Sequence, residues 1–132
     1  MPFVLDASTA ICWAMQDESD ESAETAKARA LHDRPVAPGI WWYEVRNILL
    51  LNERRGRIAA EESERYLQSI GSLVLVVFPQ ESEGTFRLAR KHKRSIYDAA
   101  YLELAVAQKL ALATLDGDLA KAAVAEGVLL VA

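Results

Sequence analysis

The sequence predicts an α/β domain, a three-layer α/β/α sandwich built on a parallel sheet of about five strands. Short apolar segments alternate along the chain with longer segments that carry apolar residues at helical spacing. The short segments are apolar throughout, so helices should cover both faces of the sheet that they form. In such sheets ligands bind beyond the carboxyl ends of the strands, and polar residues at that edge are therefore candidates for a site.

The first half of the chain is expected to fold as two strand–helix units. The apolar run Phe3–Leu5, followed at once by Asp6 and Ser8, is typical of a buried strand that leads into a capped helix. Acidic residues favour a helix N-terminus soon afterwards, and a Pro-Gly pair precedes a strongly apolar helical pattern. The elements expected here are a strand at 3–5, a helix at 8–16, a helix at 20–32 capped by Ser19, a strand at 34–37 and a helix at 40–54.

The second half repeats the alternation of helix and strand. The segment from Leu73 to Phe78 is the clearest strand, because Pro79 ends it, and Gly71 is expected to close the helix before it. Gly127 separates the final helix from a last apolar segment. The elements expected here are helices at 61–70, 81–93, 95–109 and 118–126, and strands at 73–78, 112–115 and 128–131.

Length and composition bound the class of protein. The 132 residues suit one domain spanning 1–132, and 52% hydrophobic with 26% charged residues is a usual globular balance. A single cysteine, Cys12, excludes a disulfide framework and a cysteine-based zinc site. No apolar run approaches the roughly 18 residues of a membrane span, and no basic segment precedes the first apolar run as in a signal peptide. We therefore expect a soluble cytoplasmic protein without membrane contact.

Four acidic residues are candidates for a site, because they lie at the expected carboxyl edge or on apolar helix faces where burial of a carboxylate is energetically unfavourable. Asp6 ends the first strand and Asp116 directly follows the strand at 112–115, although each alone could be an ordinary turn or cap residue. Glu44 falls inside the apolar stripe of its helix, where a carboxylate needs a partner or a metal ion. Asp98 also falls on an apolar face, and a capping box with Ser95 is the alternative explanation.

These four carboxylates are expected to lie together, and they would then repel one another unless cations are present. All-oxygen ligation suits Mg²⁺ or Mn²⁺, and such ions commonly activate water and neutralise charge on a phosphoryl group. A nucleic-acid-binding domain is usually basic. Setting the four carboxylates aside brings the formal net charge from −4 to 0, which answers much of this objection.

A basic stripe precedes Asp98 in the chain. Arg87, Arg90, Lys91 and Arg94 fall on one face of the helix expected at 81–93. The stripe is either a track for the phosphate backbone of RNA or an ordinary solvated helix face.

The chain resembles the PIN-domain ribonucleases, and in particular the VapC toxins of bacterial toxin–antitoxin pairs. The matching stretches are VLDASTAICWAM, PGIWWYEVRNIL, SIYDAAYLELA and LATLDGDLAKAA, in the expected order over essentially the whole chain. The resemblance places the acidic metal-binding set of the family on Asp6, Glu44, Asp98 and Asp116. It assigns supporting roles to Ser8, Asn47, Thr114 and Asp118, the last as a partner or substitute for Asp116.

The resemblance implies a PIN-like fold and Mg²⁺-dependent endonucleolytic cleavage of RNA, with transfer RNA and ribosomal RNA among the family's targets. It also implies a homodimer that a VapB-type antitoxin holds inactive, and Mn²⁺ should be able to replace Mg²⁺. Two alternatives stay open, a PIN-fold RNA-processing nuclease without an antitoxin and a non-catalytic PIN-type interaction module. A receiver domain is disfavoured, because only Asp6 follows the first strand and no lysine follows the last.

Overall fold

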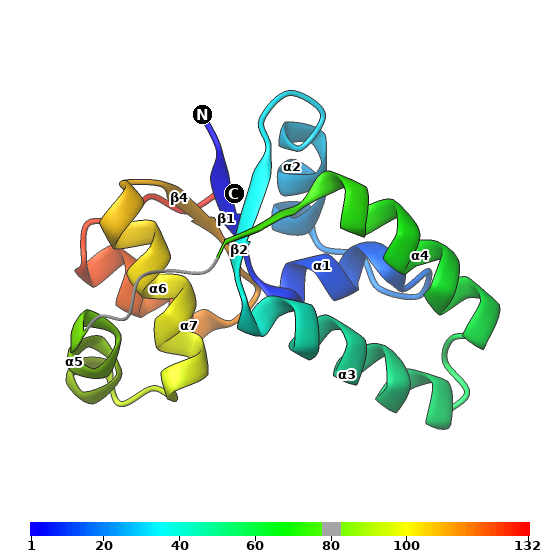
Figure 1. Cartoon of the computed structure of the whole chain (residues 1–132). Coiled ribbons are helices and arrows are strands. Elements are labelled where there is room, and N and C mark those ends of the chain that lie inside the picture. The colour runs from blue at the N-terminus through cyan, green and yellow to red at the C-terminus, as the bar shows by residue number, and fades with distance from the viewer. Residues whose placement is uncertain (78–82) are drawn as a thin grey trace.

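A computed structural model describes residues 1–77 and 83–132, with a sheet between two groups of helices (Figure 1). The strands are β1 (Phe3–Leu5), β2 (Pro35–Pro38), β3 (Leu75–Val77) and β4 (Ala111–Ala113). The helices are α1 (Ala7–Ala14), α2 (Glu21–Arg29), α3 (Ile40–Arg54), α4 (Ala60–Leu73), α5 (Glu83–His92), α6 (Ile96–Gln108) and α7 (Gly117–Ala125). The predicted α/β class with a parallel sheet is confirmed.

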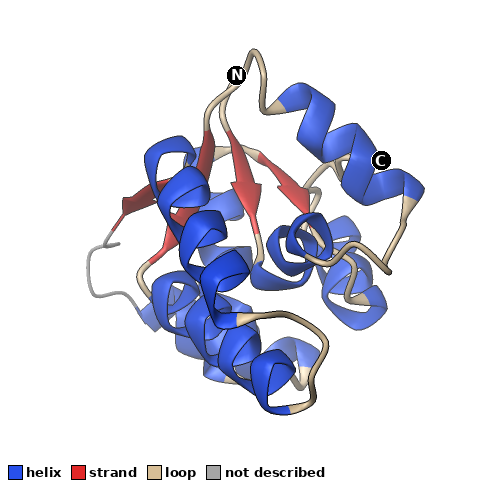
Figure 2. Ribbon diagram, turned by 90° about the vertical axis from the view of Figure 1, so that its right-hand side faces the viewer, coloured by secondary structure: helices blue, strands red, loops and turns tan. Residues whose placement is uncertain are grey.

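The order of the strands explains the layers. All four strands are parallel in the order β3-β2-β1-β4, and Val4 of β1 pairs with Val36 on one side and Leu112 on the other. Connections between parallel strands are right-handed. The chain runs from β1 through β2 to β3 in one direction across the sheet, and the connections between these strands contain α1 to α4. It then returns across the sheet to β4, and this connection contains α5 and α6. The two groups of helices therefore lie on opposite faces of the sheet (Figures 1 and 2).

The predicted fifth strand is reduced to a single bridge, which corrects the expected strand at 128–131. Within the described residues the sheet has four strands, and Leu130 forms only an isolated parallel bridge with Leu112. Gly127, at φ +79°, turns the chain back toward β4. Only Leu112 of β4 exchanges backbone hydrogen bonds with the returning segment, through Leu129 and Val131.

Several predicted ends of elements move by one to three residues. Asp20, rather than Ser19, caps α2, because its carboxylate accepts a hydrogen bond from the backbone N–H of Ala23 at 3.1 Å. Gly71 does not close its helix, since α4 continues to Leu73 before β3 begins. The expected strand residue 78, Pro79 and the expected helix residues 81 and 82 lie outside the described residues. No helix in the described ranges is long and apolar enough to cross a membrane.

Candidate functional site

The carboxylate of Asp6 lies at the end of β1 and is almost fully buried, with 4% of the residue exposed. Its Oδ1 accepts hydrogen bonds from the backbone N–H of Thr9 at 3.0 Å and from the Ser8 hydroxyl at 2.7 Å. Its Oδ2 accepts a further one from Thr114. Asp6 is therefore the N-cap of α1, as one interpretation of the sequence held. Burial raises the pKa of Asp6, although the hydrogen bonds from Thr114, Thr9 and Ser8 act against this shift.

The turn after β4 holds Asp116 beside Asp6. The hydroxyl of Thr114 donates to Asp6 and also accepts from the backbone N–H of Asp116 at 3.0 Å. Ser8 likewise accepts from the N–H of Leu115 at 3.0 Å. Ser8 and Thr114 thus link the end of β1 to the end of β4. Asp116 caps α7 through Oδ1, which leaves its Oδ2 for another partner.

Glu44 extends from α3 toward the same edge and is half-buried. Its Oε1 accepts a hydrogen bond of 2.5 Å from the hydroxyl of Tyr101 on α6, a partner that the sequence pattern did not suggest. Burial raises the pKa of Glu44, the bond from Tyr101 lowers it, and the charges of Asp98 and Asp6 raise it further. Asn47, its expected polar neighbour, is exposed and forms no side-chain hydrogen bond to any residue that the structure describes.

The guanidinium of Arg94 lies among three carboxylates. Its Nη2 is 2.8 Å from Oδ2 of Asp98 and 3.2 Å from Oδ2 of Asp116, and its Nη1 is 3.3 Å from Oδ2 of Asp118. The side chain of Arg94 is 24% exposed, whereas that of Asp118 is 68% exposed. Arg94 therefore places a positive charge among the carboxylates of this edge, a role that its position in the basic stripe did not predict.

The other members of the basic stripe have separate surroundings. The guanidinium of Arg90 lies over the ring of Phe86, 4.7 Å from its centroid. The ammonium of Lys91 pairs at 2.7 Å with Glu126, the C-cap of α7, and Arg87 is exposed. Arg87, Arg90 and Lys91 are exposed, whereas Arg94 is partly buried, and a role of the stripe in RNA binding stays a prediction.

The turn between α5 and α6 forms half of the predicted capping box. The hydroxyl of Ser95 accepts a hydrogen bond from the backbone N–H of Asp98 at 3.0 Å and so caps α6. The carboxylate of Asp98 pairs with Arg94. Capping therefore fixes the position of Asp98 on the helix but does not occupy its side chain.

Contacts at the carboxyl edge of the sheet link three of the four predicted acids, and the fourth, Glu44, is hydrogen-bonded to Tyr101 instead. Thr114 connects Asp6 to Asp116, Arg94 connects Asp116 to Asp98, and the charges of Asp98 and Asp6 act on Glu44. No three His, Cys, Asp or Glu side chains within the described ranges are grouped so that they could hold a metal ion as they stand. The donors nevertheless fit a hard divalent cation in chemistry, because all are carboxylate oxygens, and those of Asp98 and Asp116 already attract a guanidinium.

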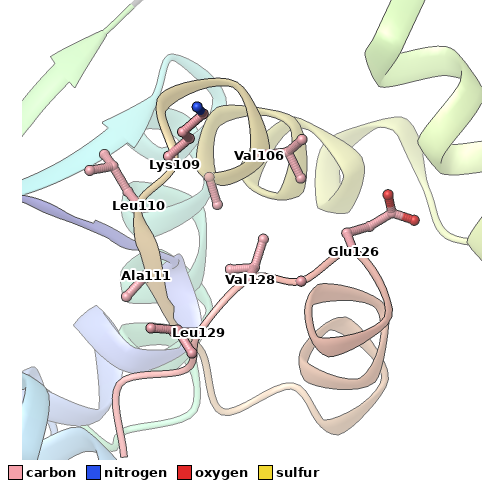
Figure 3. Close-up of a pocket in the computed structure, with 9 residues that line it drawn as sticks. Val106, Lys109, Leu110, Ala111, Glu126, Val128 and Leu129 are labelled. Atoms are coloured by element: carbon pink, nitrogen blue, oxygen red, sulfur yellow. The ribbon is translucent and has the colours of Figure 1, made fainter.

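A hollow of about 250 Å³ at the opposite edge lacks this chemistry (Figure 3). It lies between the C-terminal ends of α6 and α7, beside the start of β4, and Val106, Leu110 and Val128 contribute apolar lining. Glu126 is the one carboxylate among the described residues that line it, and Lys91 already pairs with Glu126. The candidate site is therefore the acidic edge.

Comparison with known proteins identifies the family. The model of the PIN domain family matches residues 3–125. The chain belongs to the PIN domain family. A curated relative of this PIN domain is Ribonuclease VapC3 of Pyrobaculum aerophilum, 34% identical over an alignment of 127 residues that covers 92% of this chain and 94% of the relative. A solved structure with the same fold is PAE2754 from Pyrobaculum aerophilum, with a TM-score of 0.77 and 24% identity, covering 99% of this chain and 90% of that one.

Proposed function

We propose that this PIN domain is a metal-dependent endoribonuclease whose catalytic and metal-binding residues are Asp6, Glu44, Asp98 and Asp116. The observation that carries the proposal is the contact network that joins Asp6, Asp98 and Asp116 at the carboxyl edge of the sheet, where Glu44 accepts a hydrogen bond from Tyr101. The relationship to Ribonuclease VapC3 supports RNA as the substrate. Because cellular RNA is the proposed substrate, the expected location is the cytoplasm.

The chain's own residues have distinct parts in the proposed mechanism. Ser8 and Thr114 hold Asp6 by hydrogen bonds, and Tyr101 orients Glu44 by donating to it. Arg94 screens the carboxylates from one another before substrate arrives. Bound Mg²⁺, or Mn²⁺ in its place, would supply an activated water molecule and a countercharge for the phosphoryl group.

The role of the other acid at this edge follows from its exposure. Asp118 contacts Arg94 but is largely solvent-exposed, whereas Asp116 is fixed by capping α7. We therefore assign the fourth ligand to Asp116 and an auxiliary role to Asp118.

We further propose that the protein is the toxin of a type II toxin–antitoxin pair, forming a homodimer and inhibited by a VapB-type antitoxin. The support is the relationship to Ribonuclease VapC3 over nearly the full length of both chains. Growth arrest on expression, relieved by the product of an adjacent small gene, is the expected result. Cleavage of RNA without growth arrest would instead indicate an RNA-processing nuclease.

Cleavage of total cellular RNA tests the enzymatic proposal directly. The wild-type protein should cleave RNA with Mg²⁺ or Mn²⁺ and not with EDTA, and Asp98→Asn should be inactive. Asp17→Asn is the matched control, because Asp17 is an exposed acid that pairs with Arg57 away from the acidic edge. Equal cleavage by the wild type and Asp98→Asn would refute the assignment of the site. No cleavage by the wild type, even of transfer and ribosomal RNA, would favour a non-catalytic interaction module.

A further inference from the structure

A second feature beside the acidic edge is a hollow of about 350 Å³ that opens to solvent between the α5–α6 turn and α7. Its lining residues are His92, Arg94, Asp118, Lys121 and Ala122. Arg94 belongs both to this hollow and to the ion-pair network with the acids. The hollow and the candidate catalytic residues are therefore neighbours that share one side chain.

The side chains that line the hollow include two cations and one carboxylate, although Arg94 also pairs with Asp98 and Asp116 outside the lining. Lys121 is exposed, lies three residues after Asp118 on α7, and pairs with no acid among residues 1–77 and 83–132. Arg94 and Lys121 are permanent cations, and Asp118 is the one carboxylate among the described lining residues. His92 adds a ring nitrogen whose contact, at 2.7 Å, is Glu126.

Arg94 has unused capacity for hydrogen bonding. Its two contacts through Nη2 are to Asp98 and Asp116, whereas among the described residues its Nη1 contacts Asp118 alone, at 3.3 Å. Its Nε is buried and has no hydrogen-bond partner in the part of the chain that the structure describes. A phosphate group is an anion that a guanidinium binds through two parallel N–H donors, and the donor of Arg94 that it would meet first is Nη1, whose contact with the exposed Asp118 is 3.3 Å long.

We propose that this hollow binds a backbone phosphate of RNA through Arg94 and Lys121, next to the phosphate that is cleaved at the acidic edge. The inference rests on the proposed ribonuclease function and adds to it a subsite for the neighbouring nucleotide. Arg94 exchanges carboxylate partners for the phosphate as substrate enters, while Lys121 contributes charge from the opposite wall. Contacts of this kind position the strand without reading its sequence.

Lys121→Gln tests the subsite, because Lys121 contacts none of the four acids. The probe is a labelled single-stranded 2′-O-methyl RNA of mixed sequence, bound in the presence of Mg²⁺, with its integrity checked on a gel after the titration. Dissociation constants are measured between about 50 and 300 mM salt. Each phosphate contact to a single strand contributes about 0.7 to the slope of log K against log salt. Lys121→Gln should therefore reduce the magnitude of this slope by about 0.7 and weaken RNA binding roughly fivefold at about 0.1 M salt.

Controls separate a lost phosphate contact from a change in folding. Lys27→Gln on α2, an exposed lysine on the opposite face of the sheet, should leave the slope unchanged. Lys121→Arg should keep the slope of the wild type, because it keeps the charge. All three variants should melt within about 2 °C of the wild type, as expected of exposed positions.

The outcomes also separate this inference from the proposed function. A wild-type slope in Lys121→Gln, with metal-dependent RNA cleavage intact, would overturn the subsite alone. Equal losses of RNA affinity in Lys121→Gln and Lys27→Gln would overturn the subsite as well, because they would indicate nonspecific electrostatic attraction. RNA that is neither bound nor cleaved by the wild type would overturn the proposed function itself.

Discussion

The hydroxyl of Tyr101 donates a hydrogen bond to Glu44 from within the core, and Tyr101→Phe should destabilise the metal-free protein. Tyr101 is only 2% exposed, and its hydroxyl is 2.5 Å from Oε1 of Glu44. Hydrogen bonds to charged groups contribute about 1.5–3 kcal/mol to the free energy of unfolding. For a chain of 132 residues this corresponds to a melting temperature lower by about 5–10 °C.

The destabilisation by Tyr101→Phe should depend on pH. Burial and the nearby acids raise the pKa of Glu44, so the folded state holds this proton more tightly than the unfolded chain does. The contribution of Glu44 to the free energy of unfolding is therefore fully present below its pKa in the unfolded chain. It is lost as the pH rises through the raised pKa of the folded state. Tyr101→Phe removes the interaction that lowers this pKa. The difference between variant and wild type should accordingly be small in acid and grow toward neutral pH.

Urea unfolding in EDTA at several pH values measures this effect. A double-mutant cycle with Glu44→Ala isolates the pair, because Tyr101→Phe should cost much less once Glu44 is gone. Tyr66→Phe is the matched control, since the hydroxyl of Tyr66 donates to the backbone carbonyl of Ala10 and not to an acid. A loss below about 0.5 kcal/mol, or the same loss with and without Glu44, would refute the reasoning.

Three further predictions follow from other contacts. Ser95→Ala removes the N-cap of α6 and should lower the free energy of unfolding by about 1 kcal/mol in urea titrations; no loss would mean that another group caps the helix. Hydrogen bonds from Lys91 and then His92 lower the pKa of Glu126 in the folded state. The contribution of Glu126 to the free energy of unfolding is therefore present above its pKa in the unfolded chain and is lost as the pH falls through the lowered pKa of the folded state. Glu126→Gln should thus be less stable than the wild type at neutral pH and equal to it in acid, as measured by denaturation across pH; a constant difference would contradict this. Leu112→Ala in the buried centre of β4 should cost about 2–5 kcal/mol in urea unfolding, and a cost below 1 kcal/mol would contradict its burial.

Elements with strong local signals could be predicted from the sequence. The strand at Phe3–Leu5 and the helix at Ile40–Arg54 occur with the predicted ends, because an acid caps one boundary and a Pro-Gly pair precedes the other. The last apolar segment was predicted as a strand from its composition alone. Composition does not show how many backbone N–H and C=O groups of the neighbouring strand are available for hydrogen bonding. Here only Leu112 of β4 pairs with that segment.

The positions of the four acids could also be predicted, since strand ends and helix starts place side chains at one edge. Their partners could not. The sequence places Arg94 in a basic stripe that either follows RNA or is a solvated helix face, although its position four residues before Asp98 is a spacing at which opposite charges pair. Tyr101 is a core residue on α6, and its bond to Glu44 of α3 depends on how the two sides of the sheet meet at the carboxyl edge. Such contacts join distant segments and leave no local pattern.

The hydrogen bond between Asp6 and Thr114 spans 108 residues of sequence and has a consequence for synthesis. β1 enters the interior of the sheet only when β4, near the end of the chain, is available to pair with it. At ~5–20 residues per second, a ribosome needs at least several seconds to make the intervening chain. Throughout that interval a nascent chain carries Asp6 without Thr114 or Asp116. The acidic edge is therefore completed only after 108 further residues have followed Asp6 out of the ribosome.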